Sequence, residues 1–317
     1  MRLIFCGSGD FGIPTLLSLA GLGHEVLGIF TQPPRPAGRG GKLRPTPAAE
    51  QGEKMGLPVC PVADINAPEV VAQMRSLRPE ALLVIDFGQM IGDEVCNLSE
   101  HGAVNLHGSL LPELRGAAPV NWAILRGHEQ TGVTTFRIVK RMDAGAMFVK
   151  RSTAIDKNET ALELRHRLAD LGAEAVAETL ALFVSGRQSG QEQDDSLATK
   201  APRLKKADGR IDWSADAEAI RRLVHGTWPW PGGHADFVAE SGKRQTVELG
   251  RVAALPAGGG GSPGLIGDDL TVACGTGRIA IVQIKPAGGR LMPWQDFVNG
   301  HRVRPGCRFE KTAEMTK

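Results

Sequence analysis

Asn105 and His107 are the residues whose types and spacing most clearly suggest chemistry, because they stand two positions apart in an apolar stretch ending at Gly108. On a β-strand this spacing places both side chains on one face. An amide N–H can donate to a developing oxyanion, and a protonated imidazole can donate a second hydrogen bond or a proton. Losing one oxyanion donor typically costs about 10²–10³ in rate. The pair therefore indicates acyl-type transfer.

A carboxylate from a later turn completes this candidate site. Asp143 follows a predicted strand at residues 133–139, and ligands of open α/β sheets bind at the carboxyl ends of the strands. The aspartate can hold the His107 ring in its orientation. The chain has no G-x-S-x-G elbow, and no cysteine lies near the pair in sequence. We therefore expect a transfer without a covalent enzyme intermediate, with Asn105, His107 and Asp143 as the catalytic residues.

The elements that must position these residues follow an alternating pattern. Short apolar runs at residues 3–6, 81–85 and 103–106 alternate with helical patterns such as residues 160–184. This order predicts an α/β catalytic domain over residues 1–189, with a Rossmann-like, mainly parallel sheet and helices on both faces. Asn66 is predicted to cap one of its helices.

The second half of the chain has a different pattern. Residues 190–209 are polar without periodicity, which predicts a linker. Residues 210–317 contain short strand runs broken by glycines, after a helix that Ser214 is predicted to cap. This pattern predicts a smaller C-terminal β-barrel domain, OB-like in type.

Composition limits the class of protein. The 317 residues carry a formal net charge of +2, so any nucleic-acid role must come from local patches. The five cysteines are scattered, with no metal spacing and no disulfide framework, and no matching ligand accompanies His101 and His107. No leader or membrane-spanning run is recognisable. We expect a cytoplasmic protein with no metal, no membrane association and no obligate protein partner.

A glycine-rich turn at residues 7–12 matches G-x-G-x-x-G. In a dinucleotide-binding fold the second strand ends in an acidic residue that binds the ribose. Here the second strand ends in Thr31-Gln32-Pro33, and Glu25 stands at its opposite end. The pattern therefore favours a tight strand-to-helix turn over a site for NAD.

Residues 32–47 form an unusually long connection between a strand and a helix, since such connections normally take about 2–6 residues. The segment contains Arg35, Arg39, Lys42 and Arg44 and no acidic residue. It is either a solvated flexible loop or a loop that grips a polyanion and becomes ordered on binding.

Several motifs resemble the folate-dependent formyltransferase family. They are Asn-Leu-His-Gly-Ser-Leu-Leu-Pro at 105–112, Arg-Gly-Ala-Ala-Pro at 115–119 and Met-Asp-Ala-Gly at 142–145. The basic segment at 31–40 is similar to an insertion loop in the branch of this family that acts on methionyl-tRNA. Branches acting on glycinamide ribonucleotide or amino sugars lack that loop. Further likeness at 196–200, 210–213 and 228–231 extends the resemblance over nearly the whole chain.

The resemblance implies 10-formyltetrahydrofolate as formyl donor and initiator methionyl-tRNA as acceptor, with N-formylmethionyl-tRNA as product. It assigns the catalytic roles to Asn105, His107 and Asp143. The implied folate contacts are Ser109, Leu110, Leu111, Pro112, Phe87, Gln89 and Ile91. The implied tRNA contacts are Arg35, Arg39, Lys42, Arg44, Lys205 and Lys206. A formyltransferase acting on a sugar- or nucleotide-linked amine, and a non-catalytic RNA-binding relative, are the alternatives.

Several positions depart from the family pattern, among them Glu113-Leu114, where an arginine and an aromatic residue are common, and Ala146, where aspartate is common. Gly7-Ser8-Gly9 stands where Gly-Thr-Pro is common, and Asp86 occupies a position that is usually apolar. Asp86 is either a carboxylate of the folate pocket or a residue turned to solvent at its strand end.

Overall fold

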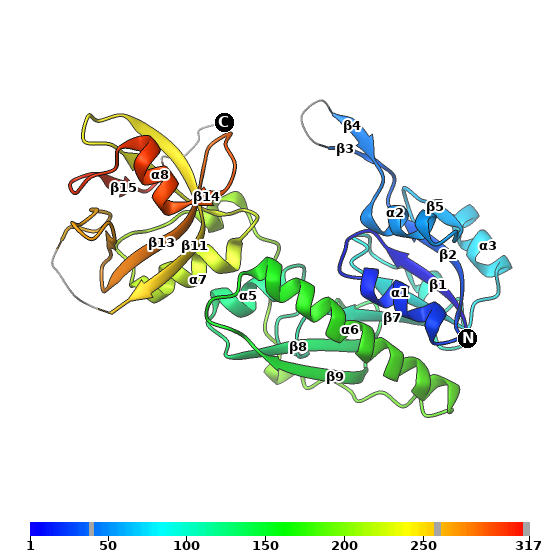
Figure 1. Ribbon diagram of the computed structural model, residues 1–317. Helices are drawn as coiled ribbons and strands as arrows, with labels where there is room; N and C mark the ends of the chain where they lie inside the picture. Colours follow the sequence, from blue (N-terminus) through cyan, green and yellow to red (C-terminus); the bar gives the residue numbers. More distant parts are fainter. Residues whose placement is uncertain (38–40, 257–260, 313–317) are drawn as a thin grey trace. The chain divides into compact units, whose positions relative to one another are not determined.

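The computed structural model describes residues 1–37, 41–256 and 261–312. The chain forms two compact units (Figure 1). Unit 1 comprises Met1–Pro119, Gln130–Thr153 and Arg165–Pro202, and unit 2 comprises Val120–Glu129, Ala154–Leu164 and Arg203–Lys317. Of the predicted linker, residues 190–202 lie in unit 1 and residues 203–209 in unit 2. The three domain boundaries stay a prediction.

Unit 1 is built on a sheet of strand order β5-β2-β1-β6-β7-β8-β9. The pairs from β5 to β7 are parallel, and β8 runs antiparallel to β7. The mainly parallel sheet is therefore confirmed. Its strands are β1 (Arg2–Gly7), β2 (Glu25–Thr31), β5 (Val59–Pro61), β6 (Ala81–Ile85), β7 (Ala103–His107), β8 (Gln130–Arg137) and β9 (Met147–Ala154).

Helices cover this sheet because each presents an apolar face to it. The longest, α6, lies along β8 and β9 in Figure 1. Gly172 of α6 sits against the Leu106 side chain, and the Thr135 and Thr179 hydroxyls are 2.7 Å apart. The other helices of unit 1 are α1 (Ile13–Gly21), α2 (Pro47–Lys54), α3 (Pro68–Ser76) and α4 (Asp93–Cys96), and α6 spans Ala161–Val184. Helix α5 (Pro119–Leu125) belongs, apart from Pro119, to unit 2.

The basic segment between β2 and α2 forms a hairpin, which the sequence did not predict. Strands β3 (Arg35–Ala37) and β4 (Lys42–Arg44) pair antiparallel, and Figure 1 shows them projecting from the rest of unit 1. We refer to β3 and β4 as the basic hairpin. Arg39 lies outside the described residues.

Unit 2 contains an antiparallel sheet of order β12-β13-β11-β10-β15. Its two edge strands are linked through Leu265, which bridges Arg308, and Ile266, which bridges Val272. The sheet is thereby nearly closed, and the predicted barrel-like domain is confirmed. Its strands are β10 (Gly233–Val238), β11 (Arg244–Leu255), β12 (Val272–Ala273), β13 (Arg278–Pro286), β14 (Met292–Pro293), which pairs with β13, and β15 (Arg308–Glu310).

The remaining helices of unit 2 are α7 (Ala217–Thr227), α8 (Trp294–His301) and the short 3-10 helix η2 (Lys206–Gly209). A second 3-10 helix, η1 (Asp195–Leu197), lies in unit 1. Apolar residues of α7, α8 and the sheet, including Ile220, Phe297 and Phe309, form one core. Within the described part of the chain, no helix has both the length and the apolar character to cross a membrane.

Two helix caps differ from the prediction. Asp216, not Ser214, caps α7 by accepting a hydrogen bond from Ala219 N, because Ser214 bonds to Asp212. Asn66 does not cap α3 either. Its amide bonds to Met90 O and Gly92 N, and so it holds the loop after β6.

Candidate active site

Asn105 and His107 lie on the same face of β7, as their spacing predicts. In the sheet Asn105 is opposite Val84 of β6, and His107 is opposite Thr134 of β8. Apart from the partly buried Asn105, the whole of β7 is buried. The two side chains are therefore carried by a central strand with little freedom to shift.

The His107 ring has one nitrogen fixed by the backbone. Its Nε2 lies 2.9 Å from Leu114 O, and because a carbonyl oxygen only accepts, Nε2 carries the proton of this bond. The ring is 7% exposed and meets the Phe136 ring edge to face. Its Nδ1 lies 4.0 Å from Asp143 Oδ2. Nδ1 is thus the nitrogen left for chemistry.

Asp143 comes from the turn after β8 and adopts a left-handed backbone conformation with φ of 51°. Aspartate tolerates this region better than most residues. Its Oδ2 accepts a hydrogen bond of 2.8 Å from Gly116 N. The carboxylate is therefore held between a peptide N–H and the imidazole.

The Asn105 amide is oriented by the neighbouring strand. Its Nδ2 donates to Val84 O at 2.9 Å. A primary amide has two N–H groups, so a second donor remains. Tertiary structure thus places an amide donor and a histidine–aspartate pair at one corner of unit 1, as the sequence predicts. Among the described residues no group of three or more potential ligands could hold a metal ion.

Comparison with known proteins identifies the family. Residues 1–180 match the family model described as formyl transferase, and residues 203–302 match that of the formyl transferase C-terminal domain. The chain belongs to the formyl transferase family. The methionyl-tRNA formyltransferase of Geotalea uraniireducens is 42% identical over 315 residues, covering 98% of each chain. That of Geobacter metallireducens is 41% identical over 310 residues, again covering 98% of each.

Solved structures share the fold of this formyl transferase. HypX of Aquifex aeolicus in complex with tetrahydrofolic acid has a TM-score of 0.66 at 17% identity. That match covers 99% of this chain, which spans 51% of HypX. The N-formyltransferase of Helicobacter canadensis in complex with folinic acid and dTDP-3-aminofucose has a TM-score of 0.65 at 12% identity, covering 89% of this chain and 99% of that one.

The loop after His107, which carries four of the predicted folate contacts, is tightly held. The Ser109 and Leu111 side chains are fully buried, Pro112 is buried and Leu110 is half-buried. The Ser109 hydroxyl donates to Glu113 O at 2.6 Å, and Leu111 N donates to the Thr134 hydroxyl at 3.1 Å. Lys150 Nζ donates to Leu111 O at 2.7 Å. The Ser109 and Leu111 side chains are therefore not exposed to a folate.

The other predicted folate contacts follow β6. Phe87 is 3% exposed and belongs to the core of unit 1, against which Ile91 packs. Gln89 braces a neighbouring loop, since its Oε1 accepts from Ile65 N at 2.8 Å and its Nε2 donates to Val62 O at 3.1 Å. Folate contact at these three positions stays a prediction.

The glycine-rich turn after β1 packs against Asp86. A Cβ atom on Gly9 would lie 1.6 Å from Asp86 Oδ2, and both Ser8 N and Gly9 N donate to Asp86 O at 3.1 Å. Arg165 Nη2 lies 2.5 Å from that Oδ2 and 3.1 Å from an Asp10 oxygen. Loss of hydration raises the pKa of the Asp86 carboxyl, although Arg165 opposes the rise. Close packing against Asp86 thus explains why position 9 is a glycine. Asp86 itself lies in a surface ion cluster with Arg165 and Asp10.

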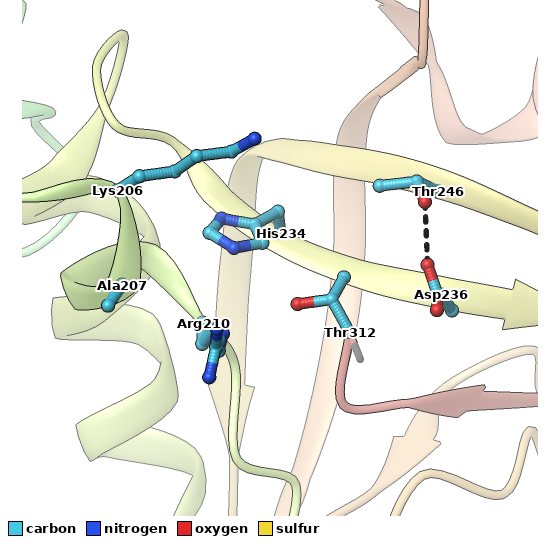
Figure 2. Close-up of a pocket in the computed structure, with 7 residues that line it drawn as sticks. All are labelled: Lys206, Ala207, Arg210, His234, Asp236, Thr246 and Thr312. Carbon is cyan, nitrogen blue, oxygen red and sulfur yellow. Dashed lines mark hydrogen bonds between the residues drawn. The ribbon is translucent and has the colours of Figure 1, made fainter. Parts of the chain in front are cut away.

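The predicted tRNA contacts lie in both units. In the basic hairpin Arg35, Lys42 and Arg44 are exposed, and Arg35 lies directly opposite Arg44. In unit 2, Lys205 and Lys206 are exposed at η2, and Lys206 lines a cavity of about 400 Å³. Figure 2 shows the His234 ring in that cavity between Lys206 and Arg210.

The sequence did not predict the backbone groups that hold the predicted catalytic residues His107 and Asp143. Leu114 O and Gly116 N hold His107 and Asp143, and Leu114 itself has a left-handed φ of 58°. The only available signal was the Arg115-Gly116 motif beside them. Gln193, which bonds to the turn that carries Asp143, came from a polar stretch with no pattern.

Proposed function

We propose that this protein transfers the formyl group of 10-formyltetrahydrofolate to the amino group of initiator methionyl-tRNA, giving N-formylmethionyl-tRNA. The observation that carries the proposal is the arrangement of Asn105, His107 and Asp143 in a chain that is about 40% identical, over nearly its full length, to methionyl-tRNA formyltransferases. Since the acceptor belongs to translation initiation, we expect the protein in the cytoplasm.

The geometry supports direct transfer between two nitrogen atoms. The neutral α-amine attacks the formyl carbon, forming a C–N bond and a tetrahedral oxyanion. The second N–H of Asn105 and the Nδ1 side of protonated His107 donate to this oxyanion. Collapse breaks the bond from carbon to N10 of the folate.

Proton movement accompanies this exchange. The attacking amine becomes cationic and must lose a proton, and Asp143 Oδ2, 4.0 Å from His107 Nδ1, is the neighbouring acceptor, directly or through a water molecule. The proton taken from the amine is passed on to the departing N10, so charge balances over the reaction. Asp143 also keeps the imidazole oriented.

The folate is proposed to lie against the two loops that follow β6 and β7. Because Gln89 and Ser109 already bond to protein groups, their side chains are engaged. Backbone groups around Phe87, Gln89 and Ile91 and along residues 109–112 would then provide the polar contacts, and Leu110 would provide an apolar one. Backbone contacts of this kind would suit a flat heterocycle with donors and acceptors along its edge.

The tRNA is proposed to meet the basic hairpin and the exposed lysines Lys205 and Lys206. Like charges directly opposite each other destabilise a strand pair. The pairing of Arg35 with Arg44, and Lys42 beside it, therefore concentrates positive charge that phosphates would neutralise. Arg39 remains a proposed contact although it lies outside the described residues.

A formyl transferase acting on an amino sugar is the second candidate. The fold is shared with the Helicobacter canadensis sugar enzyme, but that likeness is at 12% identity. The basic hairpin suits a substrate with many phosphates, such as a tRNA, better than a sugar linked to a single nucleoside diphosphate. The tRNA assignment is therefore preferred.

A formylation assay tests donor, acceptor and selectivity together. Purified protein is given 10-formyltetrahydrofolate and either initiator or elongator methionyl-tRNA, and formylmethionine is measured after hydrolysis of the ester. We expect rapid formylation of the initiator and slow formylation of the elongator. Absence of turnover on both would overturn the proposal, and equal turnover would overturn the selectivity for initiator tRNA.

A further inference from the structure

The segment after α6 contacts the loop that follows His107 and the turn that carries Asp143. We call residues 191–201 the strap. At its start the backbone groups of Gln191 and Met147 exchange two hydrogen bonds of 2.8 Å. At its end Arg115 N donates to Thr199 O at 2.8 Å, and Ala201 N donates to Arg115 O at 2.7 Å. The strap is therefore tied to β9 and to the loop beyond His107, both within unit 1.

Gln193 of the strap holds the turn that carries Asp143. Its Nε2 donates to Asp143 O at 2.9 Å and to Gly145 O at 2.8 Å. Its Oε1 accepts two bonds from Arg115, of 3.0 Å from Nε and 2.7 Å from Nη2. Both N–H donors and the oxygen of this amide are therefore in use. Left-handed Asp143 is held at its own carbonyl, the group nearest to the bend.

A shared carboxylate joins the two loops through the strap. Asp195 Oδ1 lies 2.9 Å from Arg115 Nη2 and 2.5 Å from Arg141 Nη2. Arg141 stands two residues before Asp143, and Arg115 stands next to Gly116. Hydrogen bonds from Arg141 and then Arg115 lower the pKa of the Asp195 carboxyl, so it remains charged.

The strap also holds the backbone groups that orient His107. The Thr199 hydroxyl accepts from Leu114 N at 2.8 Å, and the carbonyl of this Leu114 binds His107 Nε2. Gly116, whose N–H holds Asp143 Oδ2, has a φ of 127°, and a Cβ atom there would lie 2.5 Å from Ala201 O. Only glycine fits so close to the strap.

We propose that Gln193 is a positioning residue for formyl transfer, which sets the distance and orientation of Asp143 relative to His107. The proposal rests on the proposed function for the identity of the reaction. Gln193 acts through the turn and touches neither substrate. A misplacement of about 1 Å can cost about 10²-fold in rate, so releasing this turn should lower turnover without removing a reacting group.

The test compares Gln193→Glu and Gln193→Ala with Gln191→Ala, because Gln191 is held in the strap by hydrogen bonds of its backbone to Met147. Glutamate keeps the volume and the acceptor toward Arg115 but removes both donors to the turn. We expect both Gln193 variants to lower kcat by about 10- to 100-fold, with KM for each substrate within about twofold of wild type. Gln191→Ala should behave as wild type. Thermal unfolding checks that each variant is folded.

A second measurement separates this proposal from the reaction assigned to the protein. The imidazole ¹⁵N and ¹H resonances of His107 are recorded without substrates in the same variants. They should move in both Gln193 variants and stay unchanged in Gln191→Ala, whatever substrate the enzyme uses. Wild-type kcat in folded Gln193→Glu with unmoved His107 resonances would overturn the positioning role. Failure of wild-type protein to formylate methionyl-tRNA would overturn the proposed function instead.

Discussion

Two regions of unit 1 hold their predicted functional side chains in opposite ways. One is the corner with Asn105, His107 and Asp143, which we call the catalytic corner, and the other is the basic hairpin. His107 and Asp143 are 7% and 17% exposed, and each has a hydrogen bond to a backbone group. Arg35 and Arg44 are exposed on a hairpin of two three-residue strands, with like charges facing each other.

The difference fits the function that we propose for each region. The proposed oxyanion stabilisation would require donors fixed to a fraction of an ångström, and the corner is held by a central strand, two left-handed residues and the strap. Attraction to phosphates is long-ranged and tolerates variable side-chain positions. A projecting hairpin with concentrated charge is sufficient for that purpose. Substitutions in the two regions should therefore alter different kinetic parameters.

The largest effect is expected in the catalytic corner. Asn105→Ala or His107→Ala should lower kcat by about 10²–10³, because each removes one donor to the oxyanion while the binding surfaces remain. Single-turnover formylation measures the change. The surface variant His166→Ala, made on an exposed histidine of α6, is the matched control and should stay within about twofold. Near-normal turnover in folded Asn105→Ala and His107→Ala would show that the catalytic corner does not take part in the reaction.

In the hairpin, the double substitution Arg35→Ala/Arg44→Ala should raise KM for tRNA by about tenfold and leave KM for folate unchanged. Removing two phosphate contacts should also reduce the slope of log affinity against log salt concentration by about two. Filter binding at several salt concentrations measures this slope.

The control for the hairpin removes the same charge from exposed arginines elsewhere in unit 1, as Arg75→Ala/Arg187→Ala. This variant should keep KM for tRNA close to that of wild type. If both double variants weaken tRNA binding equally, net charge and not the hairpin is responsible.

His225, a buried histidine in unit 2, extends the comparison between fixed and exposed side chains to the free energy of unfolding. His225 is fully buried, and burial, with Arg221 and Arg251 nearby, lowers its pKa from 6.5 to about 4. The neutral form is therefore the stable folded form. Its contribution is complete above pH 6.5 and is lost as the pH falls to about 4, in total about 3 kcal/mol.

Tryptophan fluorescence can follow this transition separately, since all five tryptophans lie in unit 2 and the chain has no tyrosine. The urea concentration at the midpoint of unfolding should decrease as the pH is lowered from 6.5 to 4. In His225→Gln the overall stability should be lower but this pH dependence flatter, whereas exposed His166→Ala should keep the wild-type slope. An unchanged slope in His225→Gln would assign the pH dependence to other groups.

The smallest effect is expected at Asp86, which lies at a strand end but outside the corner. Its carboxylate is 37% exposed and faces Arg165, and ion pairs of this exposure contribute about 1 kcal/mol or less. Asp86→Asn should leave kcat and KM for folate within about twofold in the formylation assay. A tenfold rise in KM for folate would instead make Asp86 a carboxylate of the folate pocket.

Much of the fold was predictable because its signals are local. The run at residues 81–85 coincides with β6, and the helical pattern at 160–184 coincides with α6 to within one residue at its start. The i, i+2 spacing also correctly placed Asn105 and His107 on one face of β7. In each case the apolar period is a direct consequence of burying one face or a whole strand.

The failed predictions concern groups with several possible partners. Ser214 and Asp216 both have capping side chains, and only the bond from Ser214 to Asp212 leaves Asp216 as the cap. The basic hairpin was missed because its strands are only three residues long and contain proline and like charges. Such strands have no periodic signal to read.

By itself, the sequence determined which residue types could react, on which strand they lie, and the two-part architecture. Tertiary structure decided which atoms remain free. It committed His107 Nε2 to Leu114 and left Nδ1 facing Asp143, and it turned a polar stretch into the strap that holds both loops. The physical reason is the distance along the sequence over which each interaction acts. Periodicity and spacing are encoded over a few neighbouring residues, whereas each of the bonds from Gln193 to the Asp143 turn spans about 50 positions of the chain.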